Sequence, residues 1–418
     1  MSLKIKTVKS CRVCGSLDLK KVFDLGSLSI TGVFIKPTDL DPLRAPICLV
    51  FCKKCTFLQV QEEVDPDVMY DSYWYRSGTN NTMKNHLKNV VESALIHASI
   101  KNDDYVLDIG CNDGTLLKQY PDFVRKIGVD PSNAINDILD HDVIKVNDYF
   151  SAKNVKDYVK GRKVKIITSI SMFYDLSDPK SFLNDIFNLL DDSGIWVLEM
   201  NYTANMVSDL GFDMISHEHV GYYTLKSFVY LLTDSGLFVN NVSFNKINGG
   251  SIRIFCSKKD FRAGIVDETI LKEESMGLDR PETFEDLKIK IDDYIKKINE
   301  WLQIQVEQGK KIALYGASTR CNTILQYGKI GPDLVYGAAE RNPDKYGLVT
   351  SGSRIPIFPE KKIREDNPDY FFVGPYYFLE EFIEREDEYL ERGGRFFVPL
   401  PQPRIIHKVD GKLKVENI

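Results

Sequence analysis

Residues 105–117 read YVLDIGCNDGTLL, and the stretch GVDPS follows at 128–132. The apolar run at the start predicts a buried strand, and Gly110 and Gly114 predict a sharp turn that lets the backbone pass close to a ligand. A helix is expected directly after this turn, with its positive amino end toward the ligand. Asp130 ends the next expected strand, about 20 positions after the turn, where a carboxylate can accept hydrogen bonds from ribose hydroxyls. The pattern predicts a site for a nucleotide-containing ligand.

The spacing within this turn separates two classes of nucleotide-binding fold. A dinucleotide fold needs G-x-G-x-x-G, whereas this turn reads G-C-N-D-G with Asn112 at the middle position. The form D-x-G-x-x-x-G resembles motif I of class I methyltransferases, which bind S-adenosylmethionine. The resemblance implies that Asp108, Gly110, Asn112 and Gly114 line the methionine and ribose end of the cofactor, and that Asp130 holds the ribose. An NAD-binding domain or a non-catalytic Rossmann-like domain is the alternative.

The segment VNDYFS at 146–151 falls where the same family reads the adenine ring. Asn147, Asp148 and Tyr149 are therefore further candidates for binding the cofactor. Packing in the core is an equally good interpretation of the aromatic residues Tyr149 and Phe150.

Strands alternate with helices from about residue 104 onward. Apolar runs such as KIITSI and GIWVLEM are separated by helical stretches such as PKSFLNDIFNLL, which indicates a mainly parallel sheet covered on both faces. A charged connector of helical period follows, and a second alternation begins at KKIALYGAS and ends in GGRFFVPLP. We expect an α/β protein of four parts: a zinc-binding module (1–70), a class I, Rossmann-like methyltransferase domain (71–258), a helical connector (259–308) and a C-terminal Rossmann-like α/β domain (309–418).

Composition restricts the function classes. The 418 residues are 43% hydrophobic and 27% charged, as is typical of globular proteins. The net charge of −6 argues against a nucleic-acid partner, because such proteins usually carry a basic surface. No stretch reaches the roughly 18 apolar residues that span a bilayer, and the start of the chain lacks the apolar core of a signal peptide. We expect a cytoplasmic protein without a membrane partner, either a monomer or a homodimer.

Four of the eight cysteines form two C-x2-C pairs, which are CRVC (Cys11, Cys14) and CKKC (Cys52, Cys55). Two such pairs supply four thiolates, enough for closed tetrahedral coordination of Zn²⁺. Clustered thiols in a reducing compartment are metal ligands rather than disulfides. Because four thiolates leave no open coordination position, the predicted zinc site is structural. Reduced thiols packed in a small core are the alternative.

The segment SHEHVGYY at 216–223 holds the most unusual polar cluster. His217, Glu218 and His219 stand together in a hydrophobic setting, without the i, i+4 histidine pair of a helical zinc site. A histidine next to a carboxylate is suited to proton abstraction near neutral pH. Methyl transfer to carbon needs such a base, because a carbanion equivalent must form and its enolate oxygen must be stabilised. Transfer to oxygen or nitrogen often needs little more than positioning.

Several motifs, in order along nearly the whole chain, resemble one family. Besides the cysteine pairs, the cofactor turn and the histidine segment, they are YDSYWYRSGTNNTMKNHL (70–87), SMFYDLSDP (171–179), INGGSIR (247–253), YGASTRCNTILQY (315–327) and ERNPDKYG (340–347). The chain resembles the sugar C-methyltransferases of deoxysugar biosynthesis, which methylate C3 of nucleotide-linked 4-keto-6-deoxyhexoses. The resemblance implies that His219 removes the proton beside the ketone, with Glu218 orienting it, and that Tyr75 reaches into the same pocket.

This chain departs from the family pattern at two positions. It has Ser216 where a tyrosine stands two residues before the glutamate, and Tyr174 near the position of a histidine. Both changes affect a proton relay, for which His217 and Tyr222 are candidate substitutes.

The remaining candidates concern the nucleotide-sugar. Arg253 follows the paired glycines of INGGSIR, where backbone N–H groups and a guanidinium are suited to a phosphate; a tight hairpin explains these glycines equally well. The resemblance implies that the C-terminal domain holds the nucleotide-sugar, with Arg320 and Asn322 at the end of one strand–helix turn. Glu340 and Asn342 follow the next strand, at the edge where open α/β sheets bind ligands. A merely structural lid is the competing interpretation of this domain.

Together these patterns predict an S-adenosylmethionine-dependent C-methyltransferase of a nucleotide-linked keto-deoxysugar, with a structural zinc ion. O- or N-methylation of another small polar metabolite is the first alternative. An RNA methyltransferase with a zinc-knuckle recognition module and a non-catalytic scaffold are the others, and the departures at Ser216 and Tyr174 keep the scaffold open.

Overall fold

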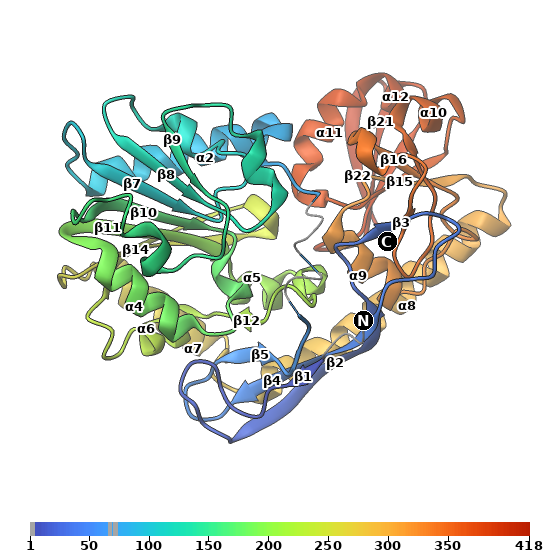
Figure 1. Cartoon of the computed structure of the whole chain (residues 1–418). Helices are drawn as coiled ribbons and strands as arrows, with labels where there is room; N and C mark the ends of the chain where they lie inside the picture. Colours follow the sequence, from blue (N-terminus) through green and yellow to red (C-terminus); the bar gives the residue numbers. More distant parts are fainter. Residues whose placement is uncertain (1–4, 66–68, 70–73) are drawn as a thin grey trace.

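Two seven-stranded sheets and a smaller N-terminal module make up the computed structural model, which describes residues 5–65, 69 and 74–418 (Figure 1). The two sheets lie on the left and right of Figure 1, and the N-terminal strands lie below and between them. Among the described residues, no helix combines the length and apolar character that crossing a bilayer requires.

The central sheet has the strand order β13-β14-β11-β10-β7-β8-β9. All pairs are parallel except those that β14 makes with β11 and β13, which are antiparallel. Strand β7 is buried along its whole length because helices cover both faces of the sheet. The strands are β7 (Tyr105–Ile109), β8 (Arg125–Val129), β9 (Val143–Val146), β10 (Val164–Ile170), β11 (Leu190–Asn201), β13 (Phe238–Asn245) and β14 (Ser251–Ser257), and the helices are α2 (Asn81–His97), α3 (Ala152–Val155), α4 (Pro179–Leu189), α5 (Thr203–Ser208), α6 (Leu225–Leu231) and α7 (Gly264–Ser275).

The helix expected after the glycine turn is not an α-helix, so that prediction was wrong. Only a three-residue 3-10 helix, η2 (Leu117–Gln119), follows the turn. Pro121 explains the difference, because a residue before proline is driven out of the helical region, and Tyr120 is extended with φ −73° and ψ 147°. A ligand at this turn therefore meets individual backbone groups and side chains rather than the amino end of a long helix.

The second sheet has the order β18-β16-β15-β19-β20-β21-β22. Its first five strands are parallel, and β21 and β22 extend it as an antiparallel hairpin that lies beyond the expected end at GGRFFVPLP. Asp410 and Gly411 form the hairpin turn, both with positive φ, and Asp-Gly is a strong hairpin signal. The elements are β15 (Ile312–Tyr315), β16 (Ala338–Glu340), β18 (Ile357–Pro359), β19 (Tyr370–Val373), β20 (Arg395–Val398), β21 (Arg404–Val409), β22 (Lys412–Asn417), α9 (Thr319–Tyr327), α10 (Glu360–Glu365), α11 (Leu379–Arg385) and α12 (Asp387–Glu391).

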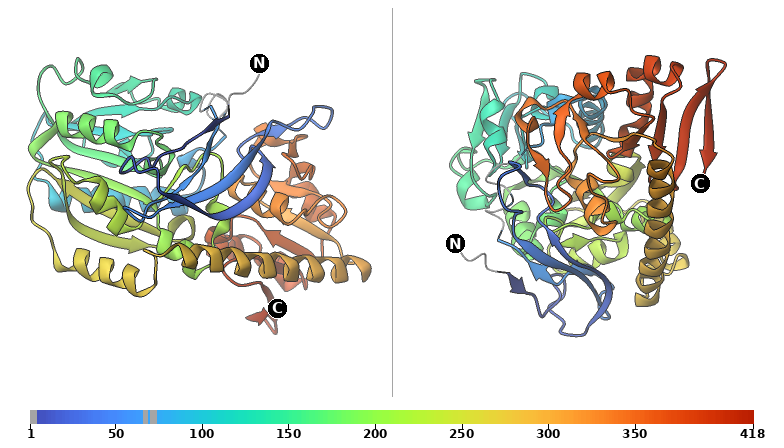
Figure 2. Two further views of the ribbon diagram at one scale, coloured as in Figure 1. Left: turned by 90° about the horizontal axis from the view of Figure 1, so that it is seen from below. Right: turned by 90° about the vertical axis from the view of Figure 1, so that its right-hand side faces the viewer.

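The 27-residue helix α8 (Pro281–Glu307) connects the two halves and runs as a straight rod along the molecule (Figure 2). Its buried side chains recur every three or four residues, beginning with Phe284, Leu287 and Ile291. Phe284 packs on Phe51 of the N-terminal module at a ring-centroid distance of 5.7 Å. The connector is therefore part of a core shared with the N-terminal module.

The N-terminal module pairs with both halves of the chain. Its sheet has the order β12-β5-β4-β2, so a strand from the central half, β12 (Gly221–Tyr222), completes it next to β5 (Leu58–Val60). On the other side β3 (Phe34–Ile35) pairs with β17 (Val349–Thr350) of the C-terminal half. The remaining strands of the module are β1 (Lys6–Thr7), β2 (Leu19–Ser29), β4 (Arg44–Cys52) and β6 (Glu62–Glu63).

A buried ion network fastens α2 to the central sheet. Both carboxylate oxygens of Glu199 are paired, one with His86 Nε2 at 2.5 Å and the other with Arg253 Nε at 2.8 Å. Arg253 also donates to Asn89 Oδ1 and to Ser93 Oγ. Burial alone would raise the pKa of Glu199, but the hydrogen bond and charge of His86 and the charge of Arg253 outweigh it and leave that pKa lowered.

We predict that Glu199→Gln destabilises the protein by about 3–5 kcal/mol, because it leaves the buried Arg253 without its counter-charge. Equilibrium denaturation measures the loss. The pKa of Glu199 in the folded protein lies below its ordinary value of 4.5. The difference in unfolding free energy between wild type and variant should therefore be fully present above the pKa of the unfolded state, and it should disappear as the pH falls through the pKa of the folded state. Glu365→Gln, which removes an exposed partner of Lys361, is the control and is expected to change nothing measurable.

Candidate active site

The four cysteines of the two pairs converge at one point. Sγ of Cys11 lies 3.4 Å from Sγ of Cys55, Sγ of Cys14 lies 3.5 Å from Sγ of Cys52, and all four sulfur atoms lie within 4.8 Å of one another. Tetrahedral zinc with Zn–S bonds of about 2.3 Å needs sulfur–sulfur distances near 3.8 Å. The donor set therefore fits a structural zinc ion.

The turn after β7 has the backbone that its glycines predict. Gly110 and Gly114 have φ of 74° and 71°, and a Cβ at residue 110 would come within 3.1 Å of Met172. Asp108 lies under the turn and accepts a 2.6 Å hydrogen bond from Thr168. Burial, with the nearby charge of Asp130 adding to it, raises the pKa of Asp108 to about 7.

Residues 75–79 lie across this turn. Asn112 donates from Nδ2 to the Tyr75 carbonyl at 3.1 Å and accepts from the Ser77 N–H at 2.9 Å. Gly78 donates its N–H to Asp113 at 2.8 Å. The side chain of Tyr75 is 41% exposed, and its partial burial, together with the nearby side chains of Tyr377 and Asp113, raises the pKa of its phenol. Tyr75 thus lies between the cofactor turn and the C-terminal half.

Asp130 follows β8 and is held rigidly. Oδ2 of its carboxylate accepts from the Asn112 N–H at 2.8 Å, and Oδ1 accepts from both the N–H and the hydroxyl of Ser132, at 2.8 and 2.5 Å, so Oδ2 retains a lone pair for a ribose hydroxyl. Asn147 donates to the carbonyls of Asp130 and Ser132, which fixes the same loop.

The other two adenine-region candidates lie at the surface. Asp148 accepts from the Tyr149 N–H, and Tyr149 is 46% exposed, so it is not a core residue. Its neighbour Phe150 does pack in the core, against Phe182.

The geometry of His219 defines its tautomer. Nδ1 lies 2.6 Å from the carbonyl oxygen of Met214 in η5 (Phe212–Met214). A carbonyl oxygen can only accept, so Nδ1 carries the proton and Nε2 the lone pair. Burial lowers the pKa of His219 to about 4; the Met214 carbonyl opposes this shift and the charge of Arg320 adds to it. The imidazole is therefore neutral at pH 7, with one basic nitrogen.

Glu218 does not orient His219 as expected, because the Met214 carbonyl occupies Nδ1. Its side chain extends instead toward the N-terminal module, where a Cβ at Gly32 would collide with Oε1 of Glu218. Burial raises the pKa of Glu218 to about 7, so this carboxyl group can either donate or accept a proton near neutrality.

Arg320 joins the central and C-terminal halves beside these two residues. Its Nη2 lies 2.7 Å from Oδ2 of Asp213, and Nη1 donates to the carbonyl of Asn248 in η6 (Ile247–Gly249). Its guanidinium also lies 5.1 Å from the ring centre of Tyr377. Burial would lower the pKa of Arg320, but the charge of Asp213 outweighs it and the pKa is raised. A permanent positive charge therefore stands next to His219.

Both departures from the family pattern are buried, and Tyr174 lies against His219. The ring of Tyr174 meets the imidazole edge-on at a centroid distance of 4.4 Å. Ser216 is 1% exposed, and its hydroxyl has no hydrogen-bond partner among the residues that the structure describes. Tyr222 is buried as well, with its phenol near the Ser216 backbone.

Three predicted site residues are buried and form hydrogen bonds within the protein. His217 is fully buried and its Nε2 bonds the Ala45 carbonyl at 2.9 Å. Asn322 is fully buried and donates to the Thr31 carbonyl at 2.7 Å. Arg253 belongs to the Glu199 network, and the INGGSIR glycines form the β13–β14 hairpin, so the phosphate interpretation is replaced by the structural one.

Glu340 and Asn342 shape the end of β16. Glu340 accepts from the N–H groups of Ala317 and Asn342, and the Asn342 side chain caps the following 3-10 turn. Lys345 lies 3.5 Å from Glu340 and 4.4 Å from the ring centre of Phe34. These residues close the C-terminal half against the N-terminal module.

Several residues of the site escaped the sequence analysis. Asp213 is buried next to Arg320, and the Tyr376 hydroxyl lies 3.4 Å from its carboxylate. Gly32 allows the close approach of Glu218. Asp213 stands three residues before the segment SHEHVGYY, so the sequence pointed to its neighbourhood. Nothing in the sequence marks Gly32 or Tyr376.

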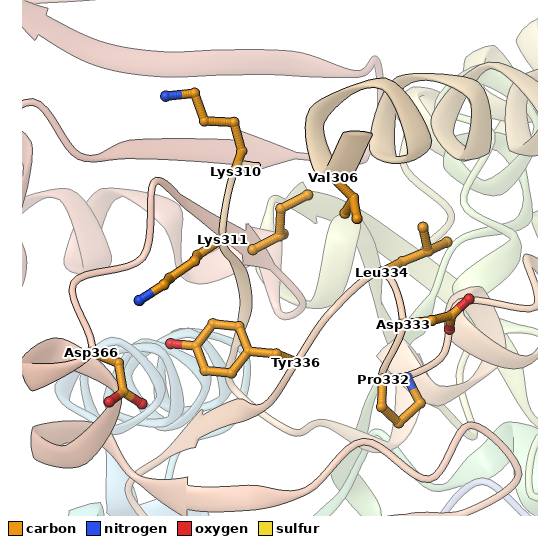
Figure 3. A pocket seen from close by; sticks show the side chains of 9 residues that line it. Val306, Lys310, Lys311, Pro332, Asp333, Leu334, Tyr336 and Asp366 are labelled. Atoms are coloured by element: carbon orange, nitrogen blue, oxygen red, sulfur yellow. The ribbon is translucent and has the colours of Figure 1, made fainter. Parts of the chain in front are cut away.

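A hollow of about 380 Å³ lies elsewhere, at the amino end of β15 (Figure 3). Lys311, Tyr336 and Asp366 are among its lining residues. It contains none of the predicted site residues, and ligands of open α/β sheets bind at the opposite, carboxyl edge.

Comparison with known proteins agrees with this arrangement. Three family models match in order: a domain described as zinc binding at residues 11–70, a methyltransferase domain at 83–241 and a C-methyltransferase C-terminal domain at 246–401. The C-methyltransferase NovU of Streptomyces niveus is 27% identical over 412 residues, which cover 96% of this chain and 98% of that protein. This chain is a C-methyltransferase.

Two solved structures each match less than half of this chain. The plantazolicin methyltransferase BpumL, in complex with a pentazolic desmethylPZN analog and SAH, is 14% identical with a TM-score of 0.35, covering 43% of this chain and 87% of that one. The N-methyltransferase NodS of Bradyrhizobium japonicum WM9 is 12% identical with a TM-score of 0.33, covering 43% and 97%. From the family models and the four-cysteine cluster, the enzyme has a class I methyltransferase core, uses S-adenosylmethionine and carries a structural zinc site.

We predict one zinc ion per chain, and its loss in Cys14→Ser. Because zinc binding is coupled to the folding of its module, this variant should melt on the order of 5–10 °C lower than the wild type. Elemental analysis and thermal unfolding measure the two effects. Cys48→Ser, which changes a buried thiol outside the cluster, should keep its zinc; zinc retention in Cys14→Ser would contradict the assignment.

Proposed function

We propose that this C-methyltransferase acts on a nucleotide-linked keto-deoxysugar, at the carbon next to the ketone, with His219 as the base. The observation that carries the proposal is the fixed tautomer of His219. Its Nδ1–H is bound to the Met214 carbonyl, which leaves Nε2 as a basic nitrogen in a buried setting. O- and N-methylation need no such group, whereas a carbon acid must lose a proton before it becomes a nucleophile.

The cofactor residues supply the other side of the reaction. Asp130, with two backbone N–H groups holding its carboxylate, would bind the ribose hydroxyls, and Asn112 and Gly110 would line the methionine end. S-adenosylmethionine supplies an electrophilic methyl group, which the substrate carbanion accepts. The 75–79 segment, hydrogen-bonded to Asn112, would cover this site and exclude water from it.

The remaining residues would position the sugar. Arg320, already holding Asp213 and Asn248, is placed to stabilise negative charge that develops on the keto oxygen. Glu218, with a pKa of about 7, would hydrogen-bond a sugar hydroxyl in either protonation state. Tyr75 would contact the sugar from the cofactor side, and the C-terminal half, closed by Glu340 and Lys345, would hold the nucleotide.

The alternatives are less well supported. O- or N-methylation of a small polar metabolite does not require the fixed tautomer of His219. An RNA substrate fits poorly with a net charge of −6.

We predict that Asp130→Ala weakens S-adenosylmethionine binding by roughly 10–100-fold, because a charged hydrogen-bond acceptor is lost. Isothermal titration calorimetry measures the change. Asp122→Ala removes a fully exposed carboxylate near the same sheet and should bind as the wild type does. Equal affinity of Asp130→Ala and wild type would exclude Asp130 from the cofactor site.

We predict that the wild type exchanges the α-proton of a nucleotide-linked 4-keto-6-deoxyhexose for deuterium in heavy water, and that His219→Ala slows this exchange by roughly 10²–10⁴-fold. Proton NMR follows the exchange, and His141→Ala, an exposed histidine change, is the control. If the wild type exchanges no keto-sugar proton, or if His219→Ala exchanges as fast as the wild type, the proposal is wrong.

The pH profile gives a second check on the base. His219 must be neutral to act, and its pKa is lowered to about 4, so the rate should rise with pH only near that value and not near the ordinary 6.5. A change in rate near pH 7 that is seen in the wild type and absent in Glu218→Gln would report the ionisation of Glu218.

A further inference from the structure

A small cavity of about 10 Å³ lies beside His219. Its walls come from the end of β11, the start of α5, η5, β12 and the 3-10 helix η4 (Phe173–Asp175), and they consist of Tyr174, Asn201, Thr203, Met214, His219, Gly221 and Tyr222. A single water molecule needs about this much space, together with two to four polar partners. The cavity thus has the size of one water molecule and touches the proposed base.

Two polar atoms at this cavity make no hydrogen bond within the described chain. They are Oδ1 of Asn201 and the phenolic oxygen of Tyr222, and both are shielded from solvent; the Ser216 backbone lies near the phenol without the geometry of a hydrogen bond. Thr203, another lining residue, already donates to the Tyr223 carbonyl at 2.8 Å. A buried polar group without a partner costs about 1–3 kcal/mol, so two of them beside one water-sized space indicate a shared partner.

The two groups are complementary and firmly placed. The amide oxygen of Asn201 only accepts, whereas the Tyr222 hydroxyl can donate or accept, so one water molecule can satisfy both. Asn201 ends β11 opposite Ser251, and Tyr222 pairs with Leu58 of the N-terminal module. Backbone hydrogen bonds in two different sheets therefore hold Asn201 and Tyr222 in place.

We propose that one ordered water molecule, bound by Asn201 and Tyr222, occupies this cavity and positions His219. The water would pack against His219 and Met214, which both line the cavity, and the Met214 carbonyl is the group that fixes the tautomer of His219. Asn201 and Tyr222 are then positioning residues that act through the water. The effect on His219 rests on the proposed function, but the water site itself does not.

Matched substitutions separate the hydrogen bonds from the packing. Asn201→Leu keeps the size of the side chain and removes the acceptor, whereas Asn201→Asp retains it. Tyr222→Phe removes only the hydroxyl. Tyr336→Phe, which deletes another unpartnered phenol far from the site, is the control.

Crystal structures at high resolution and deuterium exchange of the keto-sugar are the two measurements. We expect a water peak in the wild type and in Asn201→Asp, and its loss in Asn201→Leu and Tyr222→Phe. In those two variants kcat for exchange should fall about tenfold, the loss of one good hydrogen bond, with KM unchanged. Asn201→Asp should stay within about threefold of the wild type, and Tyr336→Phe should match it.

An empty cavity in wild-type crystals, or wild-type exchange rates in both Asn201→Leu and Tyr222→Phe, would overturn the proposal. Equal losses in Asn201→Asp and Asn201→Leu would also overturn it, since packing alone would then explain them. If His219→Ala exchanges as the wild type does while the water peak is present, the proposed function fails and the water site stands.

Discussion

The buried ion pair between Asp213 and Arg320 is the contact on which the geometry of the cleft depends. The carboxylate is 1% exposed and belongs to the central half, whereas the guanidinium belongs to the C-terminal half. Separating the halves would leave a buried charge without its partner, at a cost of several kcal/mol. The same guanidinium holds the carbonyl of Asn248, so a single side chain fixes both the η5 segment and the β13–β14 hairpin against α9. The histidine segment begins two residues after η5, so the ion pair that holds η5 also fixes the position of this segment.

Burial gives the two titratable groups His219 and Glu218 unusual pKa values. The same burial lowers the pKa of His219 and raises that of Glu218, because both shifts favour the neutral form. The positive charge of Arg320 reinforces the effect on the histidine. In the proposed reaction the neutral imidazole would accept the proton that leaves the substrate carbon, and the nearby guanidinium would stabilise the enolate that this forms.

Local patterns predicted local structure well. The glycine turn, the two C-x2-C pairs and the strand–helix alternation each depend on residues a few positions apart, and each appears in the fold. The helix after the turn was predicted wrongly because Pro121 was not weighed, and the C-terminal hairpin was missed although Asp410 and Gly411 signal it. Arg253 and Asn322 could not be assigned from sequence, since their partners Glu199 and Thr31 lie 54 and 291 positions away.

The pairing of β12 with β5 ties the histidine segment to the zinc-binding module. Tyr222 stands three residues after His219 and forms a ladder with Leu58, which lies three residues after the ligand Cys55. The metal therefore takes no part in bond making, yet the backbone that carries the proposed base is built on the scaffold that the metal holds together. Loss of the zinc ion would therefore loosen the strand pairing that supports the histidine segment, and the enzyme would lose activity although every residue of the site was unchanged.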